Sequence, residues 1–378
     1  MIVQMEVGIS LDTEEVKRVV QEAQDYGLIA RPQENQGTNF RVVQIHLQDG
    51  KTKARTIPEF GFRNLPGVAN IMRVTPSAIS ISANGTGKSH SIQLGPSAIG
   101  QGFPCQLIAG PCTVDKHINE IVGRLAAMGI KYIRGGCWKP RSDPFSFPGF
   151  GKKGVRWLLE AARNHRVEAV FTEVIDSTHI NDIEKIRREV GYQGKIVLWV
   201  GARTSNQTLM QKLSRQKEFP VMVKNGIRDR SVAEWISRAE PLLVGEKHWD
   251  ENGQFIEAKS LNQGNDQILL CSRGVENNDT QSVFRFAPNH EWISAARARK
   301  YWAPIGVDPS HSAGTMENDL VILNLESSLP HKPDFILLEV YFDSHEGKKA
   351  QCDAKQAVPL SRLNEIQKII ADHNKKHY

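Results

Sequence analysis

The chain carries eight short apolar runs, and each run ends in a reactive or charged residue. Segments with helical spacing of apolar residues separate the runs, so a strand-helix unit repeats eight times along the chain. Eight such units predict a (β/α)8 barrel, an α/β fold in which the carboxyl ends of all strands open onto one face. The runs are Gln106–Cys112, Tyr132–Lys139, Glu168–Glu173, Ile196–Arg203, Pro220–Lys224, Gln267–Arg273, Ala303–His311 and Asp334–Glu339.

The residues before the barrel predict a separate small domain. Residues 1–75 give the order of a ferredoxin-like α+β domain, and 76–103 are expected to be a linker before a catalytic barrel over 104–378. The small domain contains none of the candidate catalytic residues, so we expect it to be regulatory. Its expected elements are a strand at Ile2–Val7, a helix from Asp12 to Tyr26, a strand at Val42–Leu47, a helix at Leu65–Met72 and a strand near Arg73–Ile81.

Composition narrows the classes of partner and compartment. The 378 residues have a net charge of +6, which is compatible with nucleic acid, membrane or anionic partners. The positive residues are spread along the chain and form no recognised nucleic-acid motif, so we expect no nucleic-acid or membrane partner. Five cysteines with no disulfide-like spacing, together with the lack of a signal-peptide pattern, predict reduced thiols and a cytoplasmic location.

Cations follow several of the predicted strands. Each of them alone is typical of a surface residue, but at least five at the strand ends of one barrel would repel one another without anions. Arginine can hold phosphate or carboxylate with two parallel hydrogen bonds, and lysine supplies a compact charge that can also deliver a proton. The pattern therefore favours a pocket for multiply charged substrates. These residues are Arg134, Lys139, Arg141, Arg203, Lys224 and Arg273.

A second set combines a thiol, an imidazole and two carboxylates. Cys112 and His311 end two of the runs, Glu339 ends a third, and Asp353 follows in the next loop. A lone buried cysteine or strand histidine is more often a packing residue, and the spacing matches no recognised metal motif. Because these groups are expected at one end of the barrel, a divalent transition-metal site is chemically plausible.

The motifs in chain order resemble the 3-deoxy-7-phosphoheptulonate (DAHP) synthase family. They are Ala-Gly-Pro-Cys, Lys-Pro-Arg-Ser, Ser-Phe-Pro-Gly-Phe-Gly, Gly-Ala-Arg-Thr, Lys-Asn-Gly and Asp-Pro-Ser-His, and they cover the chain from about Cys105 to Asp353. The first 75 residues resemble the ferredoxin-like regulatory domain of one bacterial branch. The resemblance implies condensation of phosphoenolpyruvate with erythrose 4-phosphate and water to give DAHP and phosphate, the first step of the shikimate pathway to aromatic amino acids.

The resemblance also implies roles for individual residues. The expected ligands of a divalent Mn, Fe, Co or Zn ion are Cys112, His311, Glu339 and Asp353. The expected phosphoenolpyruvate site comprises Arg134, Lys139, Arg203, Lys224 and Arg273. Arg141 and Ser142 resemble the residues that bind the phosphate of erythrose 4-phosphate. Lys139 is the expected proton donor, and Glu173 is expected to help position the reacting water. A homo-oligomer and an aromatic amino acid effector, tyrosine or phenylalanine, are further expectations.

Three segments depart from the family pattern. Cys271-Ser272-Arg273-Gly274 replaces Cys-Glu-Arg-Gly, residues 284–289 replace a Thr-Arg-Asn-x-x-Asp stretch, and Tyr341-Phe342 replaces His-Pro after Glu339-Val340. Two alternatives stay open. One is 3-deoxy-octulosonate 8-phosphate synthase, which uses arabinose 5-phosphate and against which Lys-Pro-Arg-Ser argues. The other is a catalytically weak binding or regulatory barrel, against which both residue sets argue.

Overall fold

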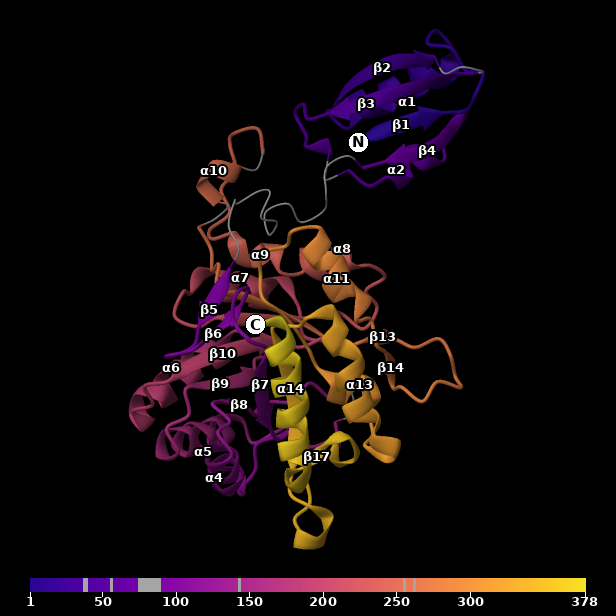
Figure 1. Ribbon diagram of the computed structural model, residues 1–378. Coiled ribbons are helices and arrows are strands. Elements are labelled where there is room, and N and C mark those ends of the chain that lie inside the picture. Colours follow the sequence, from indigo (N-terminus) through magenta and orange to yellow (C-terminus); the bar gives the residue numbers. More distant parts are fainter. Residues whose placement is uncertain (37–39, 55–56, 74–89, 142–143, 254–255, 261–262) are drawn as a thin grey trace. The chain divides into compact units, whose positions relative to one another are not determined.

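The computed structural model describes residues 1–378 except 37–39, 55–56, 74–89, 142–143, 254–255 and 261–262 (Figure 1). The chain divides into two compact units. One consists of Met1–Ile79 and His248–Glu257, and the other consists of Ser80–Lys247 and Ala258–Tyr378.

The first unit is built on a four-stranded antiparallel sheet in the order β2-β3-β1-β4. Its elements follow the chain order βαββαβ of a ferredoxin-like fold. Val16, Val19 and Ala23 form the buried stripe of α1 and pack with strand residues such as Val3 and Val43 in one core. The elements are β1 (Ile2–Met5), α1 (Glu14–Asp25), β2 (Ile29–Gln36), β3 (Arg41–Gln48), α2 (Phe60–Arg63) and β4 (Val68–Met72).

The helix predicted at Leu65–Met72 is wrong. Leu65, Val68 and Met72 have helical spacing, but Gly67 has a φ of +74°, which ends the helical path just before the chain pairs with β1. Backbone pairing along the edge of the sheet therefore prevails over the side-chain spacing. Most of the strand expected at Arg73–Ile81 lies outside the described residues.

The second unit contains the eight predicted parallel strands. Six lie inside their apolar runs, whereas β10 begins one residue before its run and β16 ends two residues after its run. Neighbouring strands pair in chain order, and pairing of β15 with β16 and of β16 with β7 closes the barrel. The predicted (β/α)8 fold is confirmed. The strands are β7 (Gln106–Gly110), β8 (Tyr132–Arg134), β9 (Ala169–Glu173), β10 (Lys195–Val200), β11 (Val221–Lys224), β12 (Ile268–Ser272), β15 (Ile305–Val307) and β16 (Phe335–Tyr341).

Helices surround the strands, and α4, α5, α6 and α7 among them are amphipathic (Figure 1). In α5, for example, Val155, Leu158, Leu159 and Ala162 form a buried stripe with helical spacing. The helices are α4 (Ile118–Ala127), α5 (Gly151–Asn164), α6 (Thr178–Val190), α7 (Gln207–Arg215), α8 (Val232–Ser237), α9 (Glu240–Leu243), α10 (Glu257–Ser260), α11 (Glu291–Ala298), α12 (Pro309–Ala313), α13 (Leu320–Ser328) and α14 (Leu363–His377). Among the described helices, none is long and apolar enough to cross a membrane.

A short hairpin, β5 (Ser91–Gln93) and β6 (Ala98–Gly100), precedes the first barrel strand. Ile92, Leu94 and Ile99 are buried in the same cluster as Phe171 and Trp199 of the barrel interior. Lys131, just before β8, donates a hydrogen bond from Nζ to Ser97 Oγ, which places the hairpin at the amino-terminal end of the barrel. This part of the segment expected to be a linker is thus packed into the barrel core.

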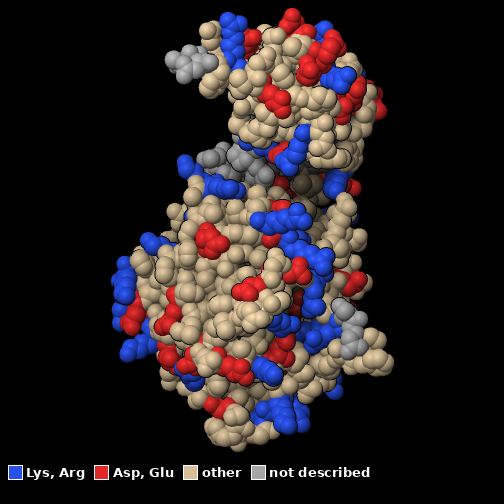
Figure 2. Space-filling model, turned by 90° about the vertical axis from the view of Figure 1, so that its right-hand side faces the viewer, with Lys and Arg blue, Asp and Glu red and all other residues tan. Residues whose placement is uncertain are grey.

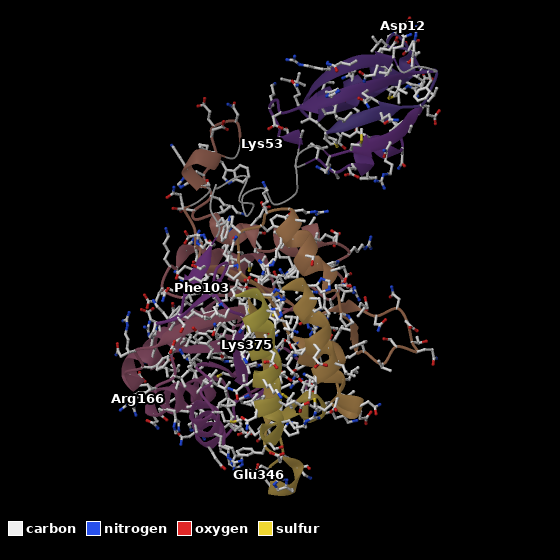
Figure 3. All side chains as sticks on the ribbon, in the orientation of Figure 1. Asp12, Lys53, Phe103, Arg166, Glu346 and Lys375 are labelled. Carbon is white, nitrogen blue, oxygen red and sulfur yellow. The ribbon has the colours of Figure 1, made fainter. Side chains whose placement is uncertain are left out.

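On the face shown in Figure 2, Lys and Arg lie among Asp and Glu, and the blue side chains are most numerous on the right-hand part of the larger unit. Many of these side chains are paired. Arg124 of α4 contacts Glu120 and also Glu346 in the loop after β16, and Glu346 is labelled in Figure 3.

Candidate active site

A cavity of about 160 Å³ opens at the carboxyl ends of the barrel strands. The structure brings most of the predicted site residues to its wall, and Arg285 and Phe286 join them from the loop after β12. Ser142, one of the predicted substrate residues, lies outside the described residues. The charged lining residues are Arg134, Lys139, Arg141, Glu173, Arg203, Lys224, Arg273, Arg285, His311 and Asp353.

Arg134 ends β8 and is completely buried. Its Nη2 lies 3.0 Å from Glu339 Oε1, and its guanidinium lies over the Trp199 ring at 5.1 Å. Within the described residues, no hydrogen-bond partner meets the geometry required by any of its three side-chain nitrogens. A buried guanidinium with unsatisfied donors is costly, and Glu339 faces only one of its nitrogens, so the arrangement favours binding of a further anion.

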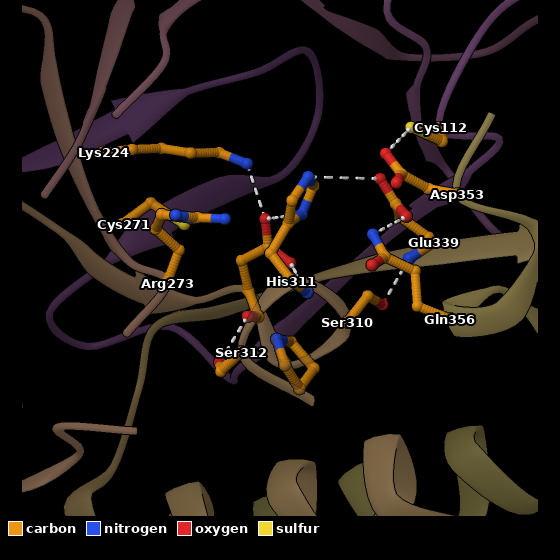
Figure 4. Close-up of polar contacts among 12 residues, drawn as sticks. Cys112, Lys224, Cys271, Arg273, Ser310, His311, Ser312, Glu339, Asp353 and Gln356 are labelled. Carbon is orange, nitrogen blue, oxygen red and sulfur yellow. Dashed lines mark hydrogen bonds and ion pairs between the residues drawn. The ribbon is translucent and has the colours of Figure 1, made fainter. Parts of the chain in front are cut away.

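Lys224, Asp308 and His311 form a buried chain of contacts beside Arg273 (Figure 4). Lys224 Nζ lies 2.5 Å from Asp308 Oδ2, and the same oxygen lies 2.7 Å from His311 Nδ1. Asp308 also caps α12 by accepting from the His311 backbone N–H, and Pro309 at the first helical position fixes the turn. Burial would raise the pKa of Asp308, but His311 and Lys224 hold it well below its usual value.

The predicted metal ligands lie together on the other side of His311 (Figure 4). His311, Glu339 and Asp353 present donor atoms within 4.8 Å of one another. Burial lowers the pKa of His311, which favours the neutral imidazole that a metal requires. Gln356 Nε2 donates to Glu339 Oε2 at 2.5 Å, whereas Glu339 Oε1 is buried without a hydrogen-bond partner among the described residues.

Cys112 completes this cluster from the loop after β7. Its Sγ lies 3.2 Å from Asp353 Oδ2, 3.3 Å from Cys352 Sγ and 3.0 Å from Lys139 Nζ. The hydrogen bond from Cys112, helped by the charge of Lys139, lowers the pKa of Cys352 to about 6. The same hydrogen bond and burial raise the pKa of Cys112. The two sulfurs lie beside a cation, in an environment suited to a thiolate.

Lys139 reaches this cluster because Gly136 leaves room for it. A Cβ at position 136 would lie 2.9 Å from Lys139 Nζ and 2.7 Å from the Cys112 carbonyl oxygen, so a side chain there would displace the lysine. Charges of nearby groups, Cys112 among them, outweigh burial and raise the pKa of Lys139. The ammonium form is therefore the resting state, as a proton donor needs.

The segments that differ from the family pattern have defined places near the site. Phe286 and Ala287 form β14, which pairs with β13 (Val275–Glu276). Arg285 lies 3.7 Å from Asp353 through Nη1, and the Arg273 guanidinium stacks on the Phe286 ring at 4.0 Å. Arg285 and Phe286 therefore both contribute directly to the cavity wall.

The change after strand β16 lies further from the cavity. Tyr341 is buried and donates a hydrogen bond to Asp115 Oδ2 at 2.5 Å, and Phe342 packs under the cation of Lys348. The Tyr341 contact ties the end of β16 to the segment after β7, the Phe342 contact lies within the loop after β16, and neither residue lies on the cavity wall.

Sequence reasoning missed Arg285, Asp308 and Cys352 as members of the site. Asp308 had a usable signal, since it stands before Pro309 as a helix cap three residues from His311. Cys352 stands next to the predicted ligand Asp353, but adjacent residues commonly face opposite ways, so the sequence gives no reason to pair it with Cys112.

The closed barrel and the charged cavity at its carboxyl end define the class of (β/α)8-barrel enzymes. The chain belongs to the DAHP synthetase I family, whose model matches residues 79–377. It is an enzyme, a transferase of the 3-deoxy-7-phosphoheptulonate synthase type.

The relatives from Thermotoga maritima agree with this assignment. A phospho-2-dehydro-3-deoxyheptonate aldolase from Thermotoga maritima is 28% identical over 93% of this chain and 92% of its own length. The crystal structure of a DAHP synthase from the same organism has a TM-score of 0.74, with 27% identity over 98% of this chain and 95% of that one. A 2-dehydro-3-deoxyphosphooctonate aldolase from Alkalilimnicola ehrlichii is 25% identical over 71% of this chain and 90% of its own length.

Proposed function

We propose that the enzyme condenses phosphoenolpyruvate with erythrose 4-phosphate and water, giving DAHP and phosphate, and that it needs a divalent metal ion. The observation that carries the proposal is Arg134, a buried guanidinium without hydrogen-bond partners among the described residues, at the base of a cavity lined by further cations. Such a cavity is suited to a small substrate that carries both a carboxylate and a phosphate.

The cations can divide the two anionic groups of phosphoenolpyruvate between them. Arg134 and Lys139 lie next to the metal donors, whereas Lys224 and Arg273 lie beyond His311, and Arg203 lies on the exposed rim. A substrate held by both groups of cations spans the cavity in one orientation. Fixing it beside a second substrate replaces a bimolecular encounter by a positioned one.

The donor set fits a divalent transition metal. Cys112, His311, Glu339 and Asp353 supply sulfur, nitrogen and oxygen donors, and Glu339 Oε1 is buried with no hydrogen bond to satisfy it among the described residues. A metal bound there would act as a Lewis acid toward the aldehyde.

Lys139 and Glu173 account for the proton and the water in this scheme. When the enol carbon attacks the aldehyde, negative charge develops on the aldehyde oxygen, and the ammonium of Lys139 can protonate it. Water then adds at C2 of the phosphoenolpyruvate moiety, and the resulting hemiketal phosphate loses inorganic phosphate. We assign the orientation of that water to Glu173, which is buried at the end of β9 and lies on the cavity wall.

The choice of aldehyde is assigned to Arg141. Its Nε donates to the Phe147 carbonyl oxygen at 3.0 Å, and the residue lies on the cavity wall at the exposed rim. With Ser142 after it, the arginine can hold the distal phosphate of a four-carbon aldehyde. Arabinose 5-phosphate is the second candidate, because several relatives are named 2-dehydro-3-deoxyphosphooctonate aldolases.

A phosphate-release assay with each aldehyde tests the assignment. We expect kcat/KM to be higher for erythrose 4-phosphate than for arabinose 5-phosphate, and Arg141→Ala to raise the KM for the aldehyde more than that for phosphoenolpyruvate. Arg215→Ala, in the last turn of α7, serves as the matched control. A higher kcat/KM for the pentose would reassign the enzyme to the octulosonate reaction.

A further inference from the structure

The candidate metal site contains a second thiol that the family resemblance does not assign. Cys352 Sγ lies 3.3 Å from Cys112 Sγ, and Cys112 Sγ also lies 3.2 Å from Asp353 Oδ2. Consecutive residues 352 and 353 therefore both direct their donor atoms toward Cys112. The donors of Cys112, Cys352 and Asp353 lie within 4.8 Å of one another, as do those of His311, Glu339 and Asp353.

Asp353 belongs to both donor groups, so the two groups form one site and not two. Asp353 has a φ of +52°, which residues other than glycine rarely adopt. Lys139 Nζ lies 3.0 Å from Cys112 Sγ and adds positive charge near the two sulfurs. The environment therefore accommodates two sulfur donors with negative charge.

The spacing of the two sulfurs is close to that of thiolates on one ion. Two Zn–S bonds of about 2.3 Å at a tetrahedral angle place the sulfurs about 3.8 Å apart. The observed 3.3 Å differs from this by less than a typical side-chain adjustment. Thr113 Oγ1, 2.6 Å from Cys352 Sγ, holds the second thiol in place.

We propose that Cys352 is a further metal ligand and supplies a second thiolate beside Cys112. The proposal rests on the metal site of the proposed function and extends it. Because thiolates are soft donors, two of them bias the site toward Zn²⁺, Co²⁺ or Fe²⁺ and against Mn²⁺, which prefers oxygen donors.

Sulfur coordination can be counted directly on the full chain, kept reduced and loaded with Co²⁺ or Zn²⁺. Zinc-edge X-ray absorption should show two sulfur neighbours in the wild type and one in Cys352→Ser. Thiolate-to-cobalt absorption per bound ion should fall to about half in the variant. Cys105→Ser is the control: Cys105 is buried just before β7, away from the cavity, and its replacement should leave both signals unchanged.

Metal competition gives a second readout that does not depend on turnover. The ratio of Zn²⁺ to Mn²⁺ affinity should fall about tenfold or more in Cys352→Ser, the scale expected when a metal environment loses a supporting group. One sulfur neighbour in the wild type, with the same competition ratio in the variant, would overturn this inference and leave the metal site intact. Absence of stoichiometric metal binding would overturn the proposed metal requirement as well.

Discussion

At the scale of single residues, Lys139 links the candidate metal donors to the cation-lined cavity. Its Nζ lies 3.0 Å from Cys112 Sγ, and the residue lies on the cavity wall. We expect Lys139→Gln to lower kcat by roughly 10²–10⁴-fold, the usual contribution of a positioned general acid. Lys195→Gln is the control, because Lys195 begins β10 at the end of the strand away from the cavity. Its kcat in steady-state kinetics should stay within twofold of the wild-type value. A kcat for Lys139→Gln within tenfold of the wild type would remove the lysine from the proton transfer.

The sequence predicted that the cations and the candidate metal donors would lie together, because the strand ends of a closed barrel must meet on one face. It did not predict which donors form contacts. The link between Lys224 and His311 passes through Asp308, and Cys352 reaches Cys112 across 240 residues of chain. Such contacts depend on loop conformations, which the apolar pattern does not specify.

At the scale of elements, the β5–β6 hairpin closes the amino-terminal end of the barrel. Ile99→Ala should lower the free energy of unfolding by about 2–5 kcal/mol, because it leaves a cavity in a fully buried cluster. Its kcat/KM should stay close to that of the wild type, since the chemistry lies at the other end. Denaturant titration measures the free energy of unfolding of this variant and of Leu323→Ala, the control at an exposed residue on α13. Equal stability of the two variants would refute the packing role of the hairpin.

His290, at the start of α11, contacts Asn324 of α13 and makes the stability of the fold depend on pH. Its Nε2 pairs with Asn324 Oδ1 at 2.8 Å, and burial lowers its pKa from 6.5. Below about pH 6.5 the unfolded chain binds a proton that the native histidine does not, so stability falls as pH decreases. The melting temperature of the wild type should therefore drop more between pH 7 and pH 5.5 than that of His290→Gln. Replacing the exposed His345 by Gln should leave the wild-type drop unchanged, and an identical drop in His290→Gln would contradict this account.

The helix expected at Leu65–Met72 shows where element prediction from sequence fails. Apolar spacing over eight residues fits a helix turn, but the position of Gly67 and pairing with β1 decide the structure. The eight barrel strands were predictable because each is buried on both faces and needs a continuous apolar run. Strand β2 carries exposed polar residues and Pro32, so it gave no such signal.

At the scale of the whole molecule, the ferredoxin-like unit is expected to regulate the barrel. A chain starting at His90 keeps the β5–β6 hairpin and should remain active, while losing inhibition by tyrosine or phenylalanine. A chain starting at Gln101 loses Ile92, Leu94 and Ile99 from the barrel core and should be markedly less stable. Inhibition assays of the full chain and the His90 form test this. Equal inhibition of both, or no response to either amino acid, would leave the unit without a regulatory role.

The central claim is a metal-dependent condensation in the cation-lined cavity, and metal add-back tests it most directly. Protein freed of metal by chelation is supplied with phosphoenolpyruvate and erythrose 4-phosphate, and consumption of phosphoenolpyruvate and release of phosphate are followed together. We predict no turnover in the metal-free protein, and equal rates of both processes once one equivalent of Zn²⁺, Co²⁺, Fe²⁺ or Mn²⁺ is added. Full turnover in verified metal-free protein, or no turnover with any of these metals, would contradict the account.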